Sequence, residues 1–369
     1  INVHDVDRDG NWQVGGEPDV FTSPAFSELA LYDATGTDRS DRIVDEGGEV
    51  RLAGIVSADP SLGPYTLTID WGDGTPLQTE LLGSDTFSFL HTYADDGTSD
   101  TDFFRYPVSV SLTDAAPVEV EQVELSAYVT NVAPGFAEIL STTITEGDFA
   151  VLSGRIADPG SLDTFMLEVH WGDGLSPGNQ QLIELGNVAI NENGVTWNPQ
   201  TNEFSFEHQY LDDNPSGTPA DDYLVQLAVT DDDGGQGDTT ALITVNNAAP
   251  TATLELNATL SDDITQFNPV VLSGQIMDVG QLDQHTVEIE WGDGTITQLD
   301  GTDDGLNLLN RQFSAEHVYA TGGIFEVAVR ITDDDTGVTT QTIVGHVSGA
   351  RLTPDGMVQI VGSDGADRV

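Results

Sequence analysis

The chain has 369 residues, of which 63 are Asp or Glu and 10 are Lys or Arg, so its formal net charge at pH 7 is −53. A protein this acidic repels nucleic acid phosphates and anionic membrane surfaces, which argues against both as partners and favours cations. The sequence contains no cysteine, which excludes disulfides and thiolate metal sites. Salt adaptation is the alternative explanation for the bulk charge, whereas the clustering of short Asp side chains favours calcium.

No apolar run approaches the length of a membrane-spanning helix, so we expect no direct insertion into a membrane. The first residues also lack the basic and apolar regions of a secretory signal peptide. We therefore expect that Ile1 is not the first residue of the gene product.

Residues 1–23 precede the first repeat and begin with an acidic motif. Asp5, Asp7 and Asp9 stand before Gly10 in the Asp-x-Asp-x-Asp-Gly pattern that opens a calcium loop. The twelfth position holds Gly16 and not the glutamate of an EF-hand, so the pattern favours calcium without predicting an EF-hand. We interpret this segment as an Asp-rich terminus or as the end of a preceding unit.

A Trp-Gly-Asp-Gly sequence then occurs three times, starting at Trp71, Trp171 and Trp291. Apolar and polar residues alternate before each Trp, which predicts half-buried strands, and Gly, Asp, Asn and Pro cluster between the runs, where turns need them. Three similar units at roughly hundred-residue spacing predict an all-β chain of three tandem antiparallel β-sandwiches. We place the domains at 24–133, 134–249 and 250–348, followed by a C-terminal segment at 349–369. The near absence of linkers favours a rod.

The residues that recur in every unit have structural interpretations. Each Trp alternates in phase with the inward-facing residues and is expected in the core, while the Gly-Asp-Gly that follows predicts a tight turn. A His-x-Tyr recurs downstream, at His91, His208 and His317, and these histidines are predicted to be structural. An active site repeated in three tandem units would be unusual, and no separate set of nucleophile and base stands out. We therefore expect no enzymatic activity.

The order of motifs, Trp-Gly-Asp-Gly after a strand, His-x-Tyr, and then Val-x-Leu-x-Val-Thr-Asp-Asp-Asp-Gly, resembles the PKD domain family across all three units. The first unit departs from this pattern with Thr113-Asp114-Ala115-Ala116. The resemblance implies an immunoglobulin-like sandwich used as a spacer or interaction module in extracellular proteins. It also implies calcium near the domain entrance, bound by an early Asp-Pro-type turn and by the preceding linker. The matching positions are Asp59, Asp158 and Asp278 in the turns, and Asn131 and Asn246 or Asn247 in the linkers. An ordinary Asx-turn is the alternative interpretation of each Asp.

The loop after His-x-Tyr is a second candidate calcium site. It begins with Asp95 and Asp96 in the first unit and with Asp212 and Asp213 in the second, but the third unit has only Ala320-Thr321-Gly322-Gly323. Carboxylates crowded into a short loop repel one another unless solvent or a cation separates them. At the C-terminus, residues 362–369 resemble one turn of the calcium-binding RTX repeat, which favours a much larger secreted parent protein.

The sequence thus favours a non-catalytic, calcium-stabilised array of the extracellular space or cell surface, acting as a spacer, an adhesin stalk or a fibre subunit. Its expected partners are neighbouring domains of the same parent protein or identical subunits. The alternative is an accessory polysaccharide-binding region of a secreted hydrolase, with surface glycans as partners. Trp197, which lies outside the repeat, distinguishes the two: an exposed indole favours sugar stacking and a buried one favours packing.

Overall fold

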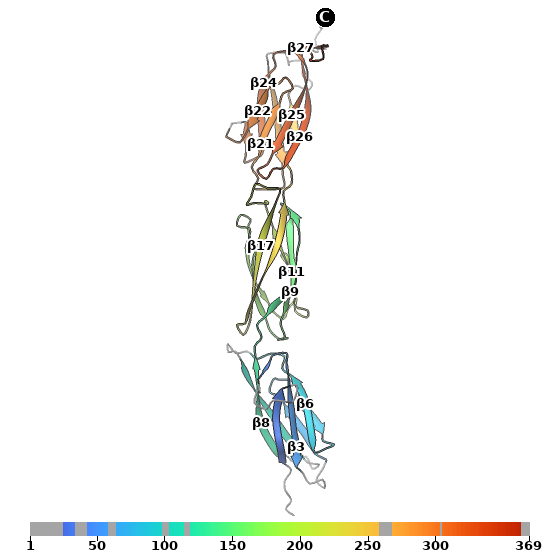
Figure 1. Cartoon of the computed structure of the whole chain (residues 1–369), viewed down its shortest axis with the longest axis vertical. Coiled ribbons are helices and arrows are strands. Elements are labelled where there is room, and N and C mark those ends of the chain that lie inside the picture. Colours follow the sequence, from blue (N-terminus) through green and yellow to red (C-terminus); the bar gives the residue numbers. More distant parts are fainter. Residues whose placement is uncertain are drawn as a thin grey trace, which may run out of the picture.

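The computed structural model describes residues 25–33, 43–57, 64–97, 103–113, 119–257, 268–302 and 305–362. In this part of the chain the regular structure consists of β-strands, which form three two-sheet units and a short final hairpin. The units follow one another along the long axis of the molecule (Figure 1). The predicted fold class, three tandem immunoglobulin-like sandwiches arranged as a rod, is confirmed. None of the described residues belongs to a helix long and apolar enough to cross a membrane.

The strands of the first unit are β1 (Ala25–Asp33), β2 (Ile43–Asp45), β3 (Glu49–Ser57), β4 (Thr66–Asp70), β5 (Gln78–Leu81), β6 (Thr86–Thr92), β7 (Phe104–Thr113) and β8 (Glu119–Thr130). Those of the second are β9 (Gly135–Ser141), β10 (Ile144–Thr145), β11 (Phe149–Ala157), β12 (Phe165–His170), β13 (Gln180–Leu185), β14 (Ile190–Glu192), β15 (Val195–Asn198), β16 (Glu203–Gln209), β17 (Ala220–Asp231) and β18 (Gln236–Asn246). The third unit contains β19 (Thr251–Leu256), β20 (Pro269–Met277), β21 (Thr286–Glu290), β22 (Ile296–Leu299), β23 (Leu306–Asn307), β24 (Gln312–Val318), β25 (Gly323–Thr332) and β26 (Val338–Val347), and the hairpin is formed by β27 (Gly349–Leu352) and β28 (Val358–Val361).

The second unit shows the shared topology in its most complete form. One sheet has the order β14-β15-β16-β11-β9 and the other has the order β10-β18-β17-β12-β13. All pairings are antiparallel except the two-residue pairing of β10 with β18, which a similar β2–β8 pairing matches in the first unit. Side chains alternate between the two faces of each strand. The inner faces of both sheets therefore bury one apolar core per unit.

The recurrent aromatic residues lie at the centre of these cores. Trp71, Trp171 and Trp291 are 2 %, 0 % and 0 % exposed, as the alternation predicts. A tyrosine hydroxyl donates a hydrogen bond to the backbone carbonyl of each Trp, over 2.9–3.1 Å. The donors are Tyr93, Tyr210 and Tyr319. Because a buried carbonyl without a partner is costly, this bond fixes the Trp backbone and the Tyr strand to each other.

The recurrent histidines have the structural role that was predicted. The ring of each stacks on the Trp of its own unit, with ring centroids 4.4–5.0 Å apart. Nε2 of each ring lies 2.7–3.3 Å from a carboxylate oxygen of the Asp in the Gly-Asp-Gly turn. Gly72 illustrates why this turn needs glycine, because its φ is +80° and a Cβ there would lie 2.3 Å from the Pro107 carbonyl oxygen.

The hairpin of β27 and β28 packs against the end of the third unit that lies away from the second unit (Figure 1). The Arg351 guanidinium lies 4.1 Å from the centroid of the Phe325 ring, and its Nε donates to Gln359. Gln359 in turn accepts a hydrogen bond from the Ile324 backbone over 2.8 Å. Hydrogen bonds and a cation–π contact therefore attach this hairpin to the third unit.

Candidate cation sites at the domain junctions

The first junction gathers acidic residues from both domains and from the linker between them. The first unit contributes the β2–β3 turn and the loop after β6, and the second unit contributes the β11–β12 and β17–β18 loops. The residues are Glu46, Asp95, Asp96, the linker residue Asn131, Asp158, Asp163, Asp231 and Asp233. We call this set the first junction cluster.

The second junction repeats this arrangement with the corresponding loops of the second and third units. Its residues are Glu146, Asp212, Asp213, the linker residue Asn247, Asp278, Asp283, Asp333 and Asp335, which we call the second junction cluster. Both junctions therefore contain the same kind of acidic cluster, formed by the same residue types from corresponding loops.

A glutamate and an asparagine hold each linker in place. Oε1 of Glu46 accepts a hydrogen bond from the Val132 backbone over 2.7 Å, and Oε1 of Glu146 accepts one from Ala248 over 2.8 Å. The amides of the linker asparagines donate to aspartates of the following domain over 3.1 and 3.2 Å. The other oxygen of each of these four side chains is buried and has no hydrogen-bond partner. Each side chain therefore leaves an acceptor oxygen unused inside its cluster.

Backbone hydrogen bonds also join the domains directly. The Ser161 N–H donates to the Ala94 carbonyl over 2.8 Å, and the Gln281 N–H donates to the Leu211 carbonyl over 2.7 Å. Each acceptor residue, Ala94 or Leu211, directly precedes the pair of aspartates that begins the acidic loop of its domain. These bonds bring the exit loop of one domain against the entry loop of the next.

Most of the unpartnered buried polar atoms of the described residues lie in the two clusters. Asp96 and Asp213 are 0 % exposed, and none of their four carboxylate oxygens has a hydrogen-bond partner. Among the described residues outside the clusters, only Trp171, Asn179 and Gln181 have such a side-chain atom. Buried carboxylates without a counter-charge are strongly destabilising. Among the described residues, no arginine forms an ion pair with a carboxylate of either cluster. The Arg311 guanidinium lies beside the second cluster but donates to the backbone carbonyls of Asp278 and Gly280.

The pKa values of the cluster carboxyls reflect this burial. Desolvation raises the pKa of Glu46 and of Glu146 to about 7. Desolvation, followed by the negative charge of neighbouring carboxylates, raises the pKa of Asp163 and of Asp213 to about 8. The pKa of Asp96 is raised to about 7, first by burial and then by the negative charge of Asp233 in the next domain. In the absence of cations these groups therefore retain protons at a pH where exposed carboxyls are ionised.

The spacing of the oxygens fits a hard divalent cation. Glu46 belongs to two groups whose ligand atoms lie within 4.8 Å of one another, one with Asp95 and Asp96 and one with Asp158 and Asp163. Calcium collects six to eight oxygens from carboxylates, carbonyls and water, and the first cluster offers only such donors. A glycine also leaves room, because a Cβ at Gly160 would lie 2.5 Å from Oε2 of Glu46 and 2.5 Å from Oδ1 of Asp163.

The structure brings most of the residues predicted from the sequence into these clusters. Those found there are Asp95, Asp96, Asp158, Asp212, Asp213, Asp278 and Asn131. Asn246 is different: its amide donates to the Ile144 carbonyl inside the second unit over 2.9 Å, and Asn247 takes the position equivalent to Asn131. The correction arises because Asn246 still belongs to β18, whereas Asn247 is the first linker residue. Asp5, Asp7, Asp9, Asp59 and the RTX-like stretch 363–369 lie outside the described residues.

Sequence reasoning missed several members of the clusters, although a signal was present. Glu46 and Glu146 stand eight residues before the repeated glycines Gly54 and Gly154, and Asp163 and Asp283 stand eight residues before a repeated Trp. The remaining missed residues lie at the β17–β18 turn of the second unit and the β25–β26 turn of the third, and they are Asp231, Asp233, Asp333 and Asp335. Aligning the repeats position by position would have identified all of them.

The same alignment shows where the acids are absent. The third unit has Gln266, Thr321 and Gly322 at the positions of Glu146, Asp212 and Asp213. The first unit has Gly63 and Ala116 at the positions of Asp163 and Asp233. The full set of cluster acids is therefore present at the ends of the domains that face another domain of this chain. Acidity of the surface in general would not predict that the acids are restricted to these ends.

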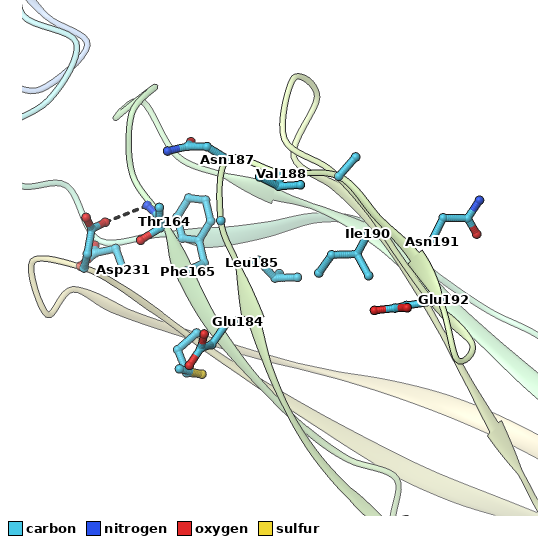
Figure 2. Close-up of a pocket in the computed structure, with 14 residues that line it drawn as sticks. Thr164, Phe165, Glu184, Leu185, Asn187, Val188, Ile190, Asn191, Glu192 and Asp231 are labelled. Carbon is cyan, nitrogen blue, oxygen red and sulfur yellow. Dashed lines mark hydrogen bonds between the residues drawn. The ribbon is translucent and has the colours of Figure 1, made fainter.

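The second unit also has a surface groove, which extends from β12 and β13 to β14 (Figure 2). Its one aromatic lining residue, Phe165, is buried. Trp197 is 3 % exposed and its Nε1 donates to the Gly186 carbonyl over 2.7 Å. Trp197 therefore packs in the core, which removes the feature that favoured sugar stacking.

Substitution Trp197→Phe is expected to destabilise the second unit by about 1–3 kcal/mol. It removes buried volume and leaves the Gly186 carbonyl without its hydrogen bond. Denaturant unfolding of the full chain measures this cost, and Val188→Ala, at an exposed residue of the groove, is the control. An unchanged unfolding curve combined with lost binding to a polysaccharide would instead support the carbohydrate-binding alternative.

No family model and no curated protein matches the chain. Among solved structures it is similar to a tetra-tandem repeat in the extending region of a large adhesion protein, at 16 % identity over 88 % of this chain and 74 % of that one, with a TM-score of 0.36. The full ectodomain of mouse nectin-like molecule 4 matches at 12 % identity over 83 % of this chain and 96 % of that one, with a TM-score of 0.26. The EC1–4 region of PcdhgB3 matches at 10 % identity over 88 % and 77 %, also with a TM-score of 0.26.

Proposed function

We propose that this chain is a non-catalytic, calcium-stabilised spacer of PKD-like domains from an extracellular or cell-surface protein. The observation that carries the proposal is the pair of junction clusters, in which buried carboxylates without partners meet between consecutive domains. The neighbours that such a spacer connects are other domains of the parent protein or identical subunits. The same rod can serve a structural or an adhesive protein.

Calcium would act in each junction as a clamp between domains. The exit loop of one domain, the linker and the entry loops of the next all supply oxygens to the same cluster. A cation bound to all three fixes their relative positions and cancels the repulsion between carboxylates such as Asp96 and Asp233. Without the cation, a few hydrogen bonds and mutually repelling carboxylates remain at the junction, so the domains should bend more freely.

An extracellular location agrees with this chemistry. Calcium sites of extracellular modules work at dissociation constants of about 10⁻⁴–10⁻³ M, and the oxygen-only donors of the first cluster are of the type such sites use. The chain has no cysteine, so its stability does not depend on disulfides. An array of this kind needs no catalytic group, because the spacing of its ends is sufficient for its role.

The test measures the distance between neighbouring domains with and without calcium. The absence of cysteine allows two spin labels to be placed uniquely, at Thr79→Cys in the first unit and Thr196→Cys in the second, which are exposed positions. Pulsed electron paramagnetic resonance on the full chain should give a narrow distance distribution in calcium and a broad one after chelation. A pair within the second unit, Thr196→Cys with Leu182→Cys, controls for changes inside a domain.

The result that would contradict the proposal is an equally broad distribution in both conditions, or narrowing by sodium chloride at matched ionic strength. The first outcome would show that calcium does not fix the junction. The second would show that general charge screening, as in a salt-adapted protein, accounts for the acidity.

A further inference from the structure

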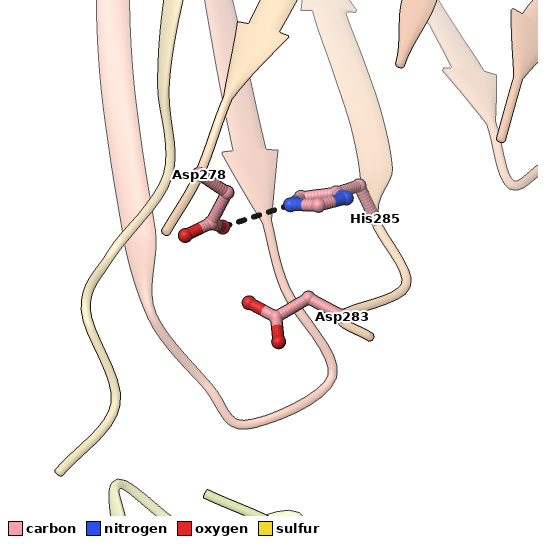
Figure 3. Close-up of side chains that lie close together, drawn as sticks. All are labelled: Asp278, Asp283 and His285. Atoms are coloured by element: carbon pink, nitrogen blue, oxygen red, sulfur yellow. Dashed lines mark hydrogen bonds and ion pairs between the residues drawn. The ribbon is translucent and has the colours of Figure 1, made fainter. Parts of the chain in front are cut away.

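The two junctions differ at one buried position that a cation could use. Six residues before the repeated Trp, the third unit has His285, whereas the second unit has Phe165 and the first has Tyr65. His285 is 3 % exposed, and its Nε2 lies 2.9 Å from Oδ2 of Asp278 (Figure 3). A nitrogen donor thus enters the second junction cluster, while the equivalent residue of the first cluster offers only a hydrocarbon ring.

The comparison of Asp278 with its counterpart Asp158 shows what the histidine changes. Oδ2 of Asp158 is buried and has no partner, because Phe165 cannot provide one. Oδ2 of Asp278 faces the imidazole of His285. In both loops the Asp Oδ1 accepts a hydrogen bond from the N–H of the glycine two residues later. The Asp278 loop differs further in that the Arg311 guanidinium donates to the Asp278 and Gly280 carbonyls.

Asp283 completes a group of three ligands. It is 8 % exposed, and both of its carboxylate oxygens are buried without a hydrogen-bond partner. Its side chain lies beside those of Asp278 and His285 (Figure 3), and one ligand atom from each of the three residues lies within 4.8 Å of the others. Two ligands of a tetrahedral zinc ion, each about 2.1 Å from the metal, are about 3.4 Å apart, so Nε2 and Oδ2, which are 2.9 Å apart as a hydrogen-bonded pair, need to separate by about 0.5 Å to bind one ion.

We propose that Asp278, Asp283 and His285 form a site for a transition-metal dication of the zinc class, present in the second junction and not in the first. Imidazole nitrogen prefers zinc, copper and nickel, whereas calcium and magnesium prefer oxygen donors. A fourth ligand is available, because Oε2 of Glu146 and Oδ1 of Asp283 approach the same side of Gly280, 2.3 and 2.4 Å from where a Cβ would lie. The site does not require that calcium bind elsewhere in the junctions.

Cobalt(II) is the probe, because its visible absorption reports nitrogen and oxygen ligands in a tetrahedral site. We expect the full chain to develop one saturable cobalt band that zinc removes and that excess calcium does not. His285→Phe, which installs the residue of the second unit, should weaken cobalt binding by more than the roughly 10–100-fold that loss of an outer-shell partner costs, because it removes a direct ligand. His346→Phe, at an exposed histidine of the same domain, should leave the band unchanged.

A second measurement does not depend on the folding of a variant. In the wild-type chain, addition of one equivalent of zinc should change the ring nitrogen chemical shifts of one histidine, His285, in the NMR spectrum. An unchanged band in His285→Phe, displacement of cobalt by calcium, or a zinc effect confined to exposed histidines would each overturn the proposal. The last result would leave His285 as an ion-pair partner of Asp278. Because calcium-dependent distances across the first junction are measured separately, failure here and failure of the calcium clamp are distinguishable.

Discussion

Chelation of calcium from the full chain is expected to lower the thermal midpoint of unfolding by about 10 °C or more. Each site that is filled at a hundredfold excess over its dissociation constant contributes about 2.7 kcal/mol to the folded state. For a domain of this size, 1 kcal/mol corresponds to about 4–8 °C. The second unit supplies ligands to both junctions, including Glu146 and Asp163, so it should show the largest change.

Differential scanning calorimetry in calcium and in chelator measures this change, and hydrogen exchange locates it. Protection should be lost in the loops 94–97, 158–164, 211–213 and 278–284 before it is lost in the core strands. Magnesium at the same concentration is the control for divalent charge, because it demands a tighter octahedral geometry. Equal midpoints in calcium and chelator would show that the clusters do not bind calcium at the concentrations used.

Neutralising a buried carboxylate of a junction is expected to have opposite effects with and without calcium. Asp163→Asn keeps the shape of the side chain but cannot ionise. In chelator the variant should be more stable than the wild type at neutral pH, because the wild-type carboxyl must either take up a proton on folding or remain charged among other carboxylates. In calcium the variant should lose most of the stabilisation by the ion, since a ligand is weakened. The stability order of wild type and variant therefore reverses between the two conditions.

The pH dependence of the stability, measured in chelator, tests the same buried carboxyl groups independently. Burial raises the pKa of Asp163 in the folded state to about 8, whereas an unfolded Asp titrates near 4. The folded state thus binds more protons between these values, so the stability of the metal-free wild type should fall as pH rises from about 4 to about 8. Asp163→Asn should reduce this slope. Glu316→Gln, at an exposed acid of β24 outside both clusters, is the control and should leave the response to calcium unchanged.

The sandwich fold and its core could be predicted from the sequence because the relevant signals are local. Alternation with a period of two places Trp71, Trp171 and Trp291 on the inner face of a strand, and the structure buries all three. The Gly-Asp-Gly turns and the structural histidines follow from the same repeated frame. Repetition strengthened each of these inferences, because three independent copies carried the same pattern.

The candidate site could be predicted only in part, and the errors have physical causes. The aspartates of the acidic loop were recognised because like charges in one short segment are conspicuous, as with Asp212 and Asp213. Glu146 and Asp283 were missed because each is a single acid among ordinary neighbours. The sequence left Asn246 and Asn247 as alternatives because the distinction depends on where β18 ends, and a shift of one residue at a strand end changes the direction of the side chain.

By itself, the sequence determined an all-β chain of three similar sandwiches, its core residues and its strongly negative charge. Only the tertiary structure decided which acids meet, because each junction cluster forms when the exit loops of one domain dock against the entry loops of the next. Glu46 and Asp163 belong to different domains, yet their carboxylate oxygens converge over Gly160. The periodicity of a strand specifies which side chains face its own core, but it contains no information about the contacts between the ends of separate domains.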